Sequence, residues 1–434
     1  MRILHVIQRY WPAGGGAERH LHEISRRLVR DGHAVTVYTT DAEDFQLFWD
    51  KRKARFDHLS DSHDGVEIRR FRLRHLPFAP LSFPVVRRSM SHLSDLPLNM
   101  TGVLPRVGQF TPWAPDLRVA LRDAGPVWDL AAGMTITYDA LLWPAMEWAA
   151  RWRRPWLVYP LTHMADSGRG AVRRYYTMQH QLELSRRAAW VFAQTETERA
   201  FLVERGVAGE RIIVAGVGIN PDEYGGGDAG RAWEALGLPP ATPLVLSLGT
   251  ASRDKGTVDV LAAMRRLWAT GSPARLVVAG SVQDGFRRVY DALPDADRAR
   301  IHLLGYVGDP LKQDLLAAAS VMCLPSRADS FGIAYLEAWM YGKPVVGARV
   351  AGIADVIADG EDGLLVPFGA PDALAAALAR LLAGAAWRET LGERGRAKVL
   401  ARYTWEQVYA RVRPAYEALG PSLRGGTTKQ SPGR

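Results

Sequence analysis

Short apolar runs of strand length alternate with amphipathic helical patterns along most of the chain. The apolar runs end at glycine, proline or polar residues, and between them apolar positions recur every three or four residues. Strands that alternate with helices in this way are typical of α/β proteins with mostly parallel sheets. We therefore expect strands at residues 3–7, 34–38, 66–71, 128–134, 156–161, 190–194, 212–217, 244–248, 276–280, 301–307, 321–324 and 345–346.

Residues 320–348 combine a buried strand, a polar loop, an amphipathic helix and a second buried strand. Residues 321–324 form an uninterrupted apolar run, and the loop after them contains Ser330, a residue type that favours the N-cap position. We expect a helix that begins near Phe331 and ends at Gly342, because glycine commonly follows the last turn of a helix. The alternative interpretation is the strand–helix–strand unit of any α/β protein, without a ligand.

The same loop and helix carry candidate ligand-binding groups. Gly332 lies at the expected helix N-terminus, where free backbone N–H groups and the positive end of the helix dipole suit phosphate. Asp329 and Glu337 are two helical turns apart, so both carboxylates can face one cleft. The stretch therefore predicts a cleft that suits phosphate and is flanked by two carboxylates.

A glycine-containing loop follows a strand near the start of each half of the chain. Gly14-Gly15-Gly16 lacks the G-x-G-x-x-G spacing, which disfavours a nicotinamide or flavin site, but its glycines let a phosphate or sugar approach the backbone. In the second half, residues 249–256 contain Lys255, a cation at a helix start that can neutralise a diphosphate. The alternatives are a tight turn for the first loop and a solvated surface lysine for the second.

His163 follows the strand expected at residues 156–161. A polar side chain at the carboxyl end of a parallel strand faces the crevice in which open α/β sheets bind ligands. His163 is therefore a candidate site residue, and a purely structural histidine is the alternative.

Composition and charge narrow the class of protein. The chain has 434 residues, of which 47% are hydrophobic, enough for the cores of two or three domains. Its 55 basic and 46 acidic residues give a net charge of +9. The arginines are scattered, which indicates a solvated surface or, alternatively, affinity for anionic substrates or an anionic membrane face. We find no nucleic-acid-binding motif.

Cysteine usage and hydropathy favour a reducing compartment. Cys323 is the single cysteine and lies in an expected buried strand, so a disulfide within the chain is impossible. The first apolar run is too short for a signal peptide, and no run approaches the roughly 18 residues of a membrane span. We expect a cytoplasmic protein that can still sit on a membrane surface.

Several of these motifs together resemble glycosyltransferase family 4. The donor-binding signature of that family resembles Asp329-Ser330-Phe331-Gly332-Ile333, Leu336-Glu337-Ala338 and Gly342-Lys343-Pro344-Val345-Val346, although the family has Glu where this chain has Asp329. The pair Gly15-Gly16, the linker at residues 216–220, the turn Gly305-Tyr306-Val307 and the segment at residues 363–367 also resemble family motifs.

The resemblance implies an α/β fold of the GT-B type, with two Rossmann-like domains whose mostly parallel sheets face a central cleft. We expect residues 1–217 to form an N-terminal acceptor-binding domain and residues 218–403 a C-terminal donor domain for the nucleotide-sugar. A hinge at residues 216–220 and the low-complexity residues 224–230 would join them. The helix expected at residues 404–419 would pack back on the first domain, and we expect residues 420–434 to be disordered.

Residues 73–115 read as an irregular segment with many prolines. A loop of this length in a compact domain is usually functional or mobile. Because the N-terminal domain of GT-B enzymes binds the acceptor, we expect this segment, with Arg72, Arg74, Arg87 and Arg88, to contact the acceptor or a membrane. A surface excursion without function is the alternative.

The resemblance also implies the residues that bind the donor. They are Gly15, Gly16, Gly249, Thr250, Lys255, Tyr306, Val307, Ser330, Phe331, Gly332, Ile333 and Glu337. Lys255 would hold the donor phosphates, Glu337 the ribose hydroxyls and Asp329 the donor sugar, and the backbone of Tyr306 and Val307 would meet the nucleobase.

Four residues are candidates for the catalytic step by resemblance: Lys255, Asp329, His163 and Arg253. The family has an arginine where this chain has Thr250, and we expect Arg253 to supply the missing charge. His163 would lie near the donor sugar and the acceptor. We predict no metal site and no cofactor, because the cations Lys255 and Arg253 would already neutralise the diphosphate.

These expectations describe a retaining hexosyltransferase. It would move a sugar from a UDP- or GDP-sugar to a glycan, lipid-linked or small-molecule hydroxyl acceptor, in cell-envelope or exopolysaccharide synthesis, in the cytoplasm or at the inner membrane face. Two alternatives stay open: a GT-B sugar-nucleotide epimerase, and a non-catalytic sugar-nucleotide-binding protein, which Thr250 and Asp329 make credible.

Overall fold

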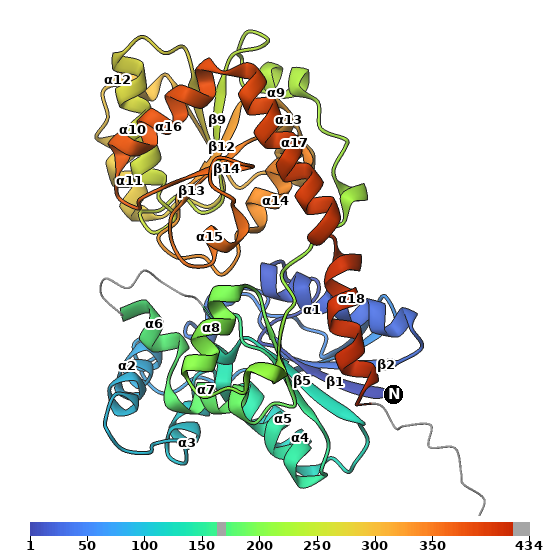
Figure 1. Cartoon of the computed structure of the whole chain (residues 1–434). Helices are drawn as coiled ribbons and strands as arrows, with labels where there is room; N and C mark the ends of the chain where they lie inside the picture. Colours follow the sequence, from blue (N-terminus) through green and yellow to red (C-terminus); the bar gives the residue numbers. More distant parts are fainter. Residues whose placement is uncertain (163–170, 420–434) are drawn as a thin grey trace, which may run out of the picture. The chain divides into compact units, whose positions relative to one another are not determined.

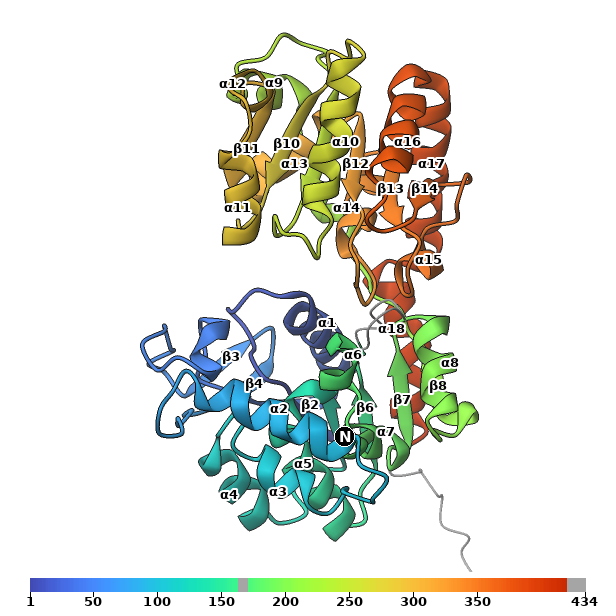
Figure 2. The same ribbon diagram turned by 90° about the vertical axis from the view of Figure 1, so that its left-hand side faces the viewer.

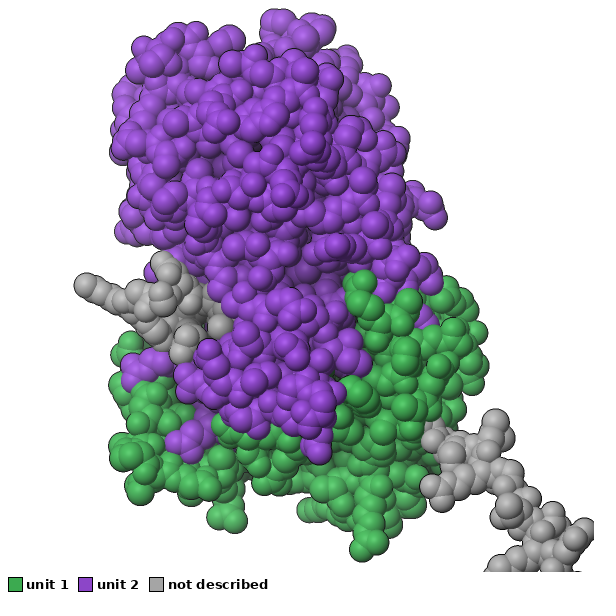
Figure 3. Space-filling model, viewed as in Figure 1, with its two compact units in different colours: residues 1–159, 183–191, 410–434 green, residues 160–182, 192–409 purple. Residues whose placement is uncertain are grey.

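The computed structural model describes residues 1–162 and 171–419, in two compact units. Unit 1 comprises residues 1–159, 183–191 and 410–434, and unit 2 comprises residues 160–182 and 192–409 (Figure 3). His163 and the expected tail at residues 420–434 lie outside the described residues. Among the helices that are described, none is both long and apolar enough to cross a membrane.

An eight-stranded sheet is built from the first half of the chain. Its strands are β1 (Arg2–Val6), β2 (Ala34–Thr40), β3 (Ser60–His63), β4 (Val66–Phe71), β5 (Leu130–Met134), β6 (Trp156–Tyr159), β7 (Trp190–Ala193) and β8 (Ile212–Val214), in the order β3-β4-β2-β1-β5-β6-β7-β8. β1, β2, β4, β5, β6 and β7 pair in parallel, and β3 pairs antiparallel to β4 as a hairpin. Apart from this hairpin strand, the order is that of a Rossmann sheet extended by one strand.

A six-stranded sheet lies in unit 2. Its strands are β9 (Leu244–Leu248), β10 (Arg275–Ala279), β11 (Ile301–Gly305), β12 (Val321–Leu324), β13 (Val345–Ala348) and β14 (Gly363–Val366), in the order β11-β10-β9-β12-β13-β14. All the pairings are parallel. This is the strand order of a Rossmann sheet. The predicted α/β class, with two Rossmann-like, mostly parallel sheets, is confirmed.

Helices connect the strands, and several of them bury an apolar stripe. They are α1 (Gly16–Arg30), α2 (Ser82–Ser94), α3 (Leu104–Gly108), α4 (Pro115–Asp123), α5 (Asp139–Arg151), α6 (Ala171–Tyr176), α7 (Gln179–Arg186), α8 (Glu196–Glu204), α9 (Ala229–Ala235), α10 (Thr257–Ala269), α11 (Asp284–Asp291), α12 (Asp295–Arg298), α13 (Asp309–Ala318), α14 (Ile333–Met340), α15 (Ile353–Val356), α16 (Pro371–Ala383), α17 (Ala385–Arg402) and α18 (Trp405–Glu417). In α1, for example, Leu21, Ile24 and Leu28 are fully buried at helical spacing.

The sheet of unit 2 is covered by helices on both faces. α10 packs against α16 and α11 on one face, whereas α9 packs against α13 and α14 against α17 on the other (Figures 1 and 2). The strands are therefore buried from both sides and read as continuous apolar runs. Cys323 lies in β12 as a free, buried thiol, as we predicted.

The segment at residues 73–115 is not irregular, and this prediction was wrong. It contains α2 and α3, and Met90 and Leu104 on these helices are fully buried. The prolines misled the sequence interpretation because Pro84 and Pro105 lie in first turns, where proline is tolerated. Arg87 was also placed wrongly on a contact surface: its guanidinium is buried and donates to the Asp139 carboxylate at 2.9 Å.

The last helix contributes to unit 1 through its C-terminal part. Tyr416 of α18 is fully buried, and its hydroxyl lies 3.1 Å from Nε2 of His5 in β1 and 3.2 Å from the hydroxyl of Tyr159 in β6. The other ring nitrogen of His5, Nδ1, lies 2.8 Å from the Ser25 hydroxyl of α1. Burial lowers the pKa of His5 to about 3, so this link between four elements is made by a neutral imidazole.

Candidate functional site

Three glycines follow adjacent strands at one edge of the sheet in unit 2. Gly249 and Gly280 come directly after β9 and β10, and Gly305 ends β11. A Cβ atom at Gly280 would lie 2.0 Å from the Gly249 carbonyl oxygen, and the φ angles of 135° at Gly249 and 138° at Gly280 favour glycine. The carboxyl edge of a parallel sheet is where ligands bind, and here the loops after β9 and β10 pack closely enough to require glycine.

The loops that follow β9 and β12 lie side by side. Gly256 ends the first loop with φ 74°, and a Cβ there would lie 2.2 Å from the carbonyl oxygen of Pro325. Arg327 donates its backbone N–H to the carbonyl oxygen of Asp254 at 2.8 Å, and its guanidinium pairs with the Asp254 carboxylate at 3.0 Å. The two loops that we predicted to carry ligand-binding groups are therefore joined directly.

Lys255 and Asp329 meet across these two loops. The Lys255 ammonium donates to Oδ2 of Asp329 at 2.7 Å. The lysine side chain is 34% exposed and the aspartate 15%, so solvent weakens the ion pair and its contribution to stability is modest. An ammonium group has three donors, so Lys255 can keep Asp329 and still donate to an anionic ligand.

Helix α14 begins one residue after a glycine in the left-handed region. Gly332 has φ 89°, and a Cβ there would lie 2.4 Å from the ring of Tyr335. The Tyr335 ring is fully buried and its hydroxyl donates to the carbonyl oxygen of Leu324 at 2.6 Å, so the ring cannot move aside. Our prediction of Ser330 as the N-cap was wrong: Gly332 holds that position and no side chain caps the helix.

The side chain of Phe331 points into the protein at the start of α14, so its backbone and that of Gly332 border the loop. Phe331 is buried, and its ring packs edge-to-face on Tyr403 at a centroid distance of 5.2 Å. A Cβ at Gly352 would lie 2.5 Å from the carbonyl oxygen of Asp329, so the loop is also confined from that side. The first N–H groups of α14, from Ile333 onward, have no side-chain cap, and such groups can bind an anion.

Glu337 is held by two partners from distant segments. Its Oε1 accepts hydrogen bonds from the Tyr224 hydroxyl at 2.9 Å and from the Lys312 ammonium at 3.2 Å. Lys312 also pairs with Asp309 at 2.9 Å. Burial alone would lower the pKa of Lys312, but the Glu337 and Asp309 carboxylates outweigh it and raise that pKa. The carboxylate of Glu337 is thus buried and oriented before any ligand binds.

Tyr306 and Val307 follow the left-handed Gly305 at the end of β11. Gly305 has φ 69°, and the Tyr306 side chain beside it is exposed. The backbone here borders the same carboxyl edge as Gly249 and Gly280, because β9, β10 and β11 are neighbours in the sheet.

Unit 1 contains the other predicted glycine loop. Gly15 precedes α1 and Gly16 begins it, and a Cβ at Gly15 would lie 2.1 Å from a carboxylate oxygen of Glu18. Glu18 is buried and accepts from the Arg9 guanidinium at 3.1 Å, and Arg9 also donates to the carbonyl oxygen of Gly14 at 3.2 Å. The loop is therefore fixed by an ion pair, and its glycines leave its backbone uncovered by Cβ atoms.

Two family models match most of the chain. The model described as "Glycosyl transferase 4-like domain" matches residues 15–218, and "Glycosyl transferases group 1" matches residues 232–398. The D-inositol 3-phosphate glycosyltransferase of Nocardiopsis dassonvillei is 33% identical over 394 residues, which cover 87% of this chain and 83% of that protein. The chain belongs to glycosyltransferase family 4. The predicted family and glycosyltransferase class are confirmed.

Other relatives match over a shorter span. The D-inositol 3-phosphate glycosyltransferase of Segniliparus rotundus is 30% identical over 239 residues, 54% of this chain and 52% of that protein. The protein of the same name from Thermobifida fusca is 30% identical over 47% of this chain and 50% of its own length. In these two alignments the chain spans about half the length of the relatives.

Solved structures share the fold of this chain over nearly its whole length. Sucrose-phosphate synthase from Thermosynechococcus elongatus superposes with a TM-score of 0.70 at 22% identity, covering 96% of this chain and 98% of that one. The Anabaena protein HepE in complex with UDP gives a TM-score of 0.69 at 19% identity, covering 96% and 100%. At these identities the likeness establishes the fold, so the predicted GT-B class is confirmed.

This family 4 member departs from the donor signature at Thr250. The Thr250 hydroxyl lies 3.0 Å from that of Ser281, so the position where the family has an arginine carries no charge. Arg253 is exposed. Burial raises the pKa of Asp259 overall, and the positive charge of Arg253 opposes part of that rise. The role of Arg253 stays a prediction.

Three residues of this family 4 site were missed by the sequence interpretation: Tyr224, Lys312 and Arg327. Tyr224 was assigned to a low-complexity hinge, yet it contacts Glu337, and the backbone N–H of Asp228 nearby donates to Asp314 at 2.7 Å. Lys312 reads as a surface lysine of α13. Arg327 lies in the predicted loop, two residues before Asp329. This positive charge next to a candidate site carboxylate is the one signal that could have identified it.

Proposed function

We propose that this glycosyltransferase transfers a hexosyl group from a nucleotide-diphosphate sugar to a hydroxyl acceptor with retention of the anomeric configuration. The bond from the anomeric carbon to the diphosphate oxygen breaks, and a bond to the acceptor oxygen forms on the same face of the sugar. The acceptor proton passes to the departing phosphate oxygen. One observation carries the proposal: the Lys255 ammonium lies 2.7 Å from Asp329, in the loops that join β9 to α10 and β12 to α14.

In this proposal the leaving diphosphate is stabilised by groups that are already oriented. Lys255 and the uncapped N–H groups at the start of α14 meet the charge that develops on the phosphate oxygens, and such preorganised donors are usually the largest catalytic contribution. Asp329 holds the donor-sugar hydroxyls and supports the oxocarbenium-like charge. Glu337, which Tyr224 and Lys312 orient, accepts hydrogen bonds from the ribose hydroxyls.

We propose that the donor is a UDP-sugar, with a GDP-sugar as the second candidate. The chain shares its fold with the Anabaena protein HepE, whose structures contain UDP and UDP-glucose. This likeness supports uracil as the base of the donor nucleotide. The acceptor is a hydroxyl compound. The names of the relatives contain inositol 3-phosphate, so a small phosphorylated polyol is the first candidate. A glycan or a lipid-linked acceptor of cell-envelope synthesis is the second. Lysine neutralises the diphosphate, so we expect turnover to persist in EDTA.

The first test is thermal unfolding with UDP, GDP and ADP at millimolar concentration. A nucleotide present at about 100 times its dissociation constant stabilises the protein by roughly 2.7 kcal/mol and raises the unfolding midpoint by a few degrees. We expect UDP to give the largest shift. Donor sugars on that nucleotide then serve as substrates with a panel of acceptors, and NMR of the product reads the anomeric configuration.

The same assays separate the two rival functions. Binding without transfer to any acceptor would favour a non-catalytic sugar-nucleotide-binding protein, which the uncharged Thr250 makes credible. Conversion of the donor without an acceptor would favour an epimerase. An inverted product anomer would refute the retaining step but leave the donor site intact.

We further propose that α2 and the residues before it contact the cytoplasmic membrane face. Phe78 is 88% exposed, Leu81 71% and Val85 62%, and the exposed Arg88 is close to them in sequence. Apolar side chains with a neighbouring cation are typical of surfaces that bind anionic lipid. Sedimentation with vesicles that contain anionic lipid should decrease for Phe78→Ser/Leu81→Ser, and binding equal to that of the wild type would refute the contact.

A further inference from the structure

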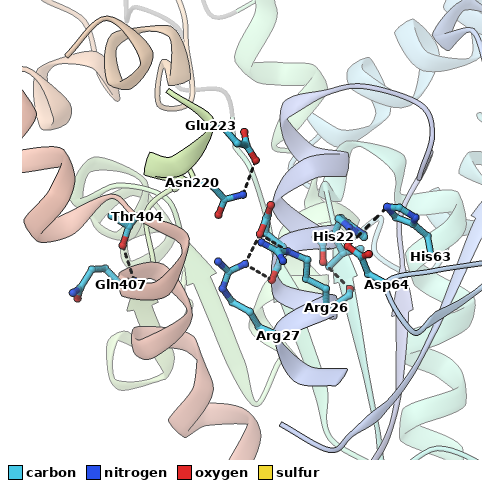
Figure 4. Close-up of polar contacts among 12 residues, drawn as sticks. His22, Arg26, Arg27, His63, Asp64, Asn220, Glu223, Thr404 and Gln407 are labelled. Atoms are coloured by element: carbon cyan, nitrogen blue, oxygen red, sulfur yellow. Dashed lines mark hydrogen bonds and ion pairs between the residues drawn. The ribbon is translucent and has the colours of Figure 1, made fainter. Parts of the chain in front are cut away.

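Three potential metal ligands converge in unit 1, between α1 and the β3–β4 hairpin. Nε2 of His22 lies 3.1 Å from Oδ2 of Asp64, and Nε2 of His63 lies 3.9 Å from the same oxygen (Figure 4). The three ligand atoms all lie within 4.8 Å of one another. None of these residues belongs to the donor site that we described in unit 2.

The backbone fixes two of these ligands. His63 ends β3 and pairs with Val66 of β4, so Asp64 and Gly65 form the two-residue turn of the hairpin. Asp64 has φ 49° and Gly65 has φ 74°, the left-handed pair that an Asp-Gly hairpin turn requires. This turn holds the carboxylate of Asp64 next to the imidazole of His63.

Neighbouring side chains orient the two imidazoles. The Tyr10 hydroxyl lies 3.0 Å from Nδ1 of His22, which leaves Nε2 of that ring for the cluster. The indole of Trp11 stacks on His63 at a centroid distance of 3.9 Å and an interplanar angle of 1°. Histidine ligands of metals usually have such partners on the other ring nitrogen or face, which set the tautomer and the ring direction.

The loop that carries Tyr10 and Trp11 is itself tied to the hairpin. Arg70 of β4 is buried, and its guanidinium donates to the Trp11 carbonyl oxygen at 2.6 Å and to the Asp61 carboxylate of β3 at 3.2 Å. The frame around His22, His63 and Asp64 is therefore held together before any ion is present.

We propose that His22, His63 and Asp64 form a binding site for a divalent transition-metal ion of the Zn²⁺ type. Two imidazole nitrogens and one carboxylate oxygen are a ligand set that such ions favour, with water in the remaining position. Ligand atoms of a tetrahedral zinc ion lie about 3.3 Å apart, because each is about 2.0–2.1 Å from the metal. The separations of 3.1 and 3.9 Å from the Asp64 oxygen lie on either side of this value, and all three ligand atoms lie within 4.8 Å of one another. The side chains of His63 and Asp64 are partly exposed, so small rotations can bring them to this spacing.

The alternative is an Asp–His hydrogen bond beside a stacked pair of histidines. The rings of His22 and His63 are stacked at a centroid distance of 5.0 Å, and a hydrogen bond from His22 to Asp64 would account for one of the two short approaches. It does not account for the second imidazole nitrogen directed at the same oxygen.

Metal binding at this place would fasten the hairpin to α1. Outside the cluster, the hairpin and α1 meet at Gly65, where a Cβ would lie 2.8 Å from a methyl group of Val29. The ion would add a second link near the N-terminal half of α1, which begins at the glycine loop. We therefore assign the ion a structural role in unit 1, independent of the proposed transfer reaction.

The test uses the full-length protein, stripped with EDTA and desalted, and then titrated with Co²⁺ and Zn²⁺. We expect visible d–d absorption from one bound Co²⁺ per chain, its displacement by Zn²⁺, and a rise of a few degrees in the unfolding midpoint with Zn²⁺. Absence of both the absorption and retained zinc after desalting would overturn the proposal.

Matched variants decide which residues bind the ion. Asp64→Asn keeps a residue that tolerates the left-handed turn but removes the anionic ligand, and His22→Gln removes one imidazole. Each should raise the dissociation constant of Zn²⁺ at least about tenfold, whereas His58→Ala, at an exposed histidine that precedes β3, should bind as the wild type does. Equal zinc binding by all three variants would overturn the assignment. Circular dichroism verifies folding, and donor turnover serves as a separate readout.

Discussion

Two groups of ionisable side chains, one in each unit, are held in opposite ways. In unit 2, Lys255 pairs with Asp329 and Lys312 with Glu337, so the charges are kept and are balanced by opposite charges near the surface. In unit 1, burial lowers the pKa of His5 to about 3, and the ring stays neutral among hydroxyl groups. The comparison indicates that the charged pairs of unit 2 can take up an ionic ligand, as binding of a diphosphate requires, whereas the hydrogen-bonded network around His5 in unit 1 is neutral and closed.

The largest expected effect is on turnover in Lys255→Ala. Loss of the ammonium removes a preorganised donor to the leaving phosphate, and we expect kcat/KM to fall about 100- to 1000-fold. The unfolding midpoint should change little, because the pair with Asp329 is partly exposed. Lys51→Ala, at an exposed lysine of unit 1, is the matched control for charge. A collapse in stability that accounts for the lost activity would make Lys255 a structural residue.

The next largest effect concerns the backbone at the start of α14. Gly332→Ala forces a side chain into the left-handed region and against the buried Tyr335 ring, so we expect a loss of about 3 kcal/mol or more in the free energy of unfolding. Gly237→Ala is the control, because Gly237 has φ 64° with nothing within 4 Å of an added Cβ, and about 1 kcal/mol should be lost there. Urea unfolding measures both, and equal losses would contradict the packing argument.

The pH dependence of stability should show His5, which with His20 is one of two buried histidines in the described part of unit 1 whose pKa burial lowers to about 3. The pKa of His5 is about 3 in the folded state against 6.5 as the ordinary value, so below pH 6.5 the unfolded state takes up a proton that the folded state does not. Stability is fully present above pH 6.5 and is lost as the pH falls toward 3, about 2 kcal/mol by pH 5. His5→Gln should remove the His5 part of this slope and leave the part due to His20, whereas His58→Gln should leave the whole slope unchanged. Identical slopes in urea unfolding would refute the assignment.

The smallest effect is expected for Tyr224→Phe. This change removes the hydroxyl that donates to Glu337 at 2.9 Å and keeps the ring, so we expect about 1 kcal/mol of stability to be lost. The exposed Tyr306 provides the control variant Tyr306→Phe, which should unfold like the wild type. A wild-type midpoint for Tyr224→Phe would mean that the hinge segment does not support the donor site.

The sequence interpretation succeeded where the residues of a feature lie close together along the chain. It failed where the contacting residues lie far apart in the sequence. Asp329, Gly332 and Glu337 lie in one strand–loop–helix unit, where local periodicity and helix geometry are enough to place them. The α/β class and the strands other than β3 and β14 were predictable for the same reason. Tyr224 and Lys312 reach Glu337 from 113 and 25 residues away, and no local pattern marks a contact that only the tertiary fold creates.

The errors have equally specific causes. Ser330 has the right chemistry for an N-cap, but Gly332 accepts a backbone conformation that no other residue there could adopt against Tyr335. Residues 73–115 appeared irregular because prolines in the first turns of α2 and α3 look like helix breakers in the sequence. Arg87 looked like a surface cation because its partner, Asp139, is 52 residues away.

The central claim, that unit 2 binds the nucleotide of the donor through Glu337, is tested most directly by calorimetric titration with UDP. We compare the wild type with Glu337→Gln, which keeps the shape of the side chain but removes its charge, and with Glu361→Gln at an exposed position of the same unit. The account predicts an affinity at least about tenfold lower, or about 1.4 kcal/mol, for Glu337→Gln alone. Equal affinities for all three proteins, or no binding of UDP, GDP or ADP to the wild type, would contradict it.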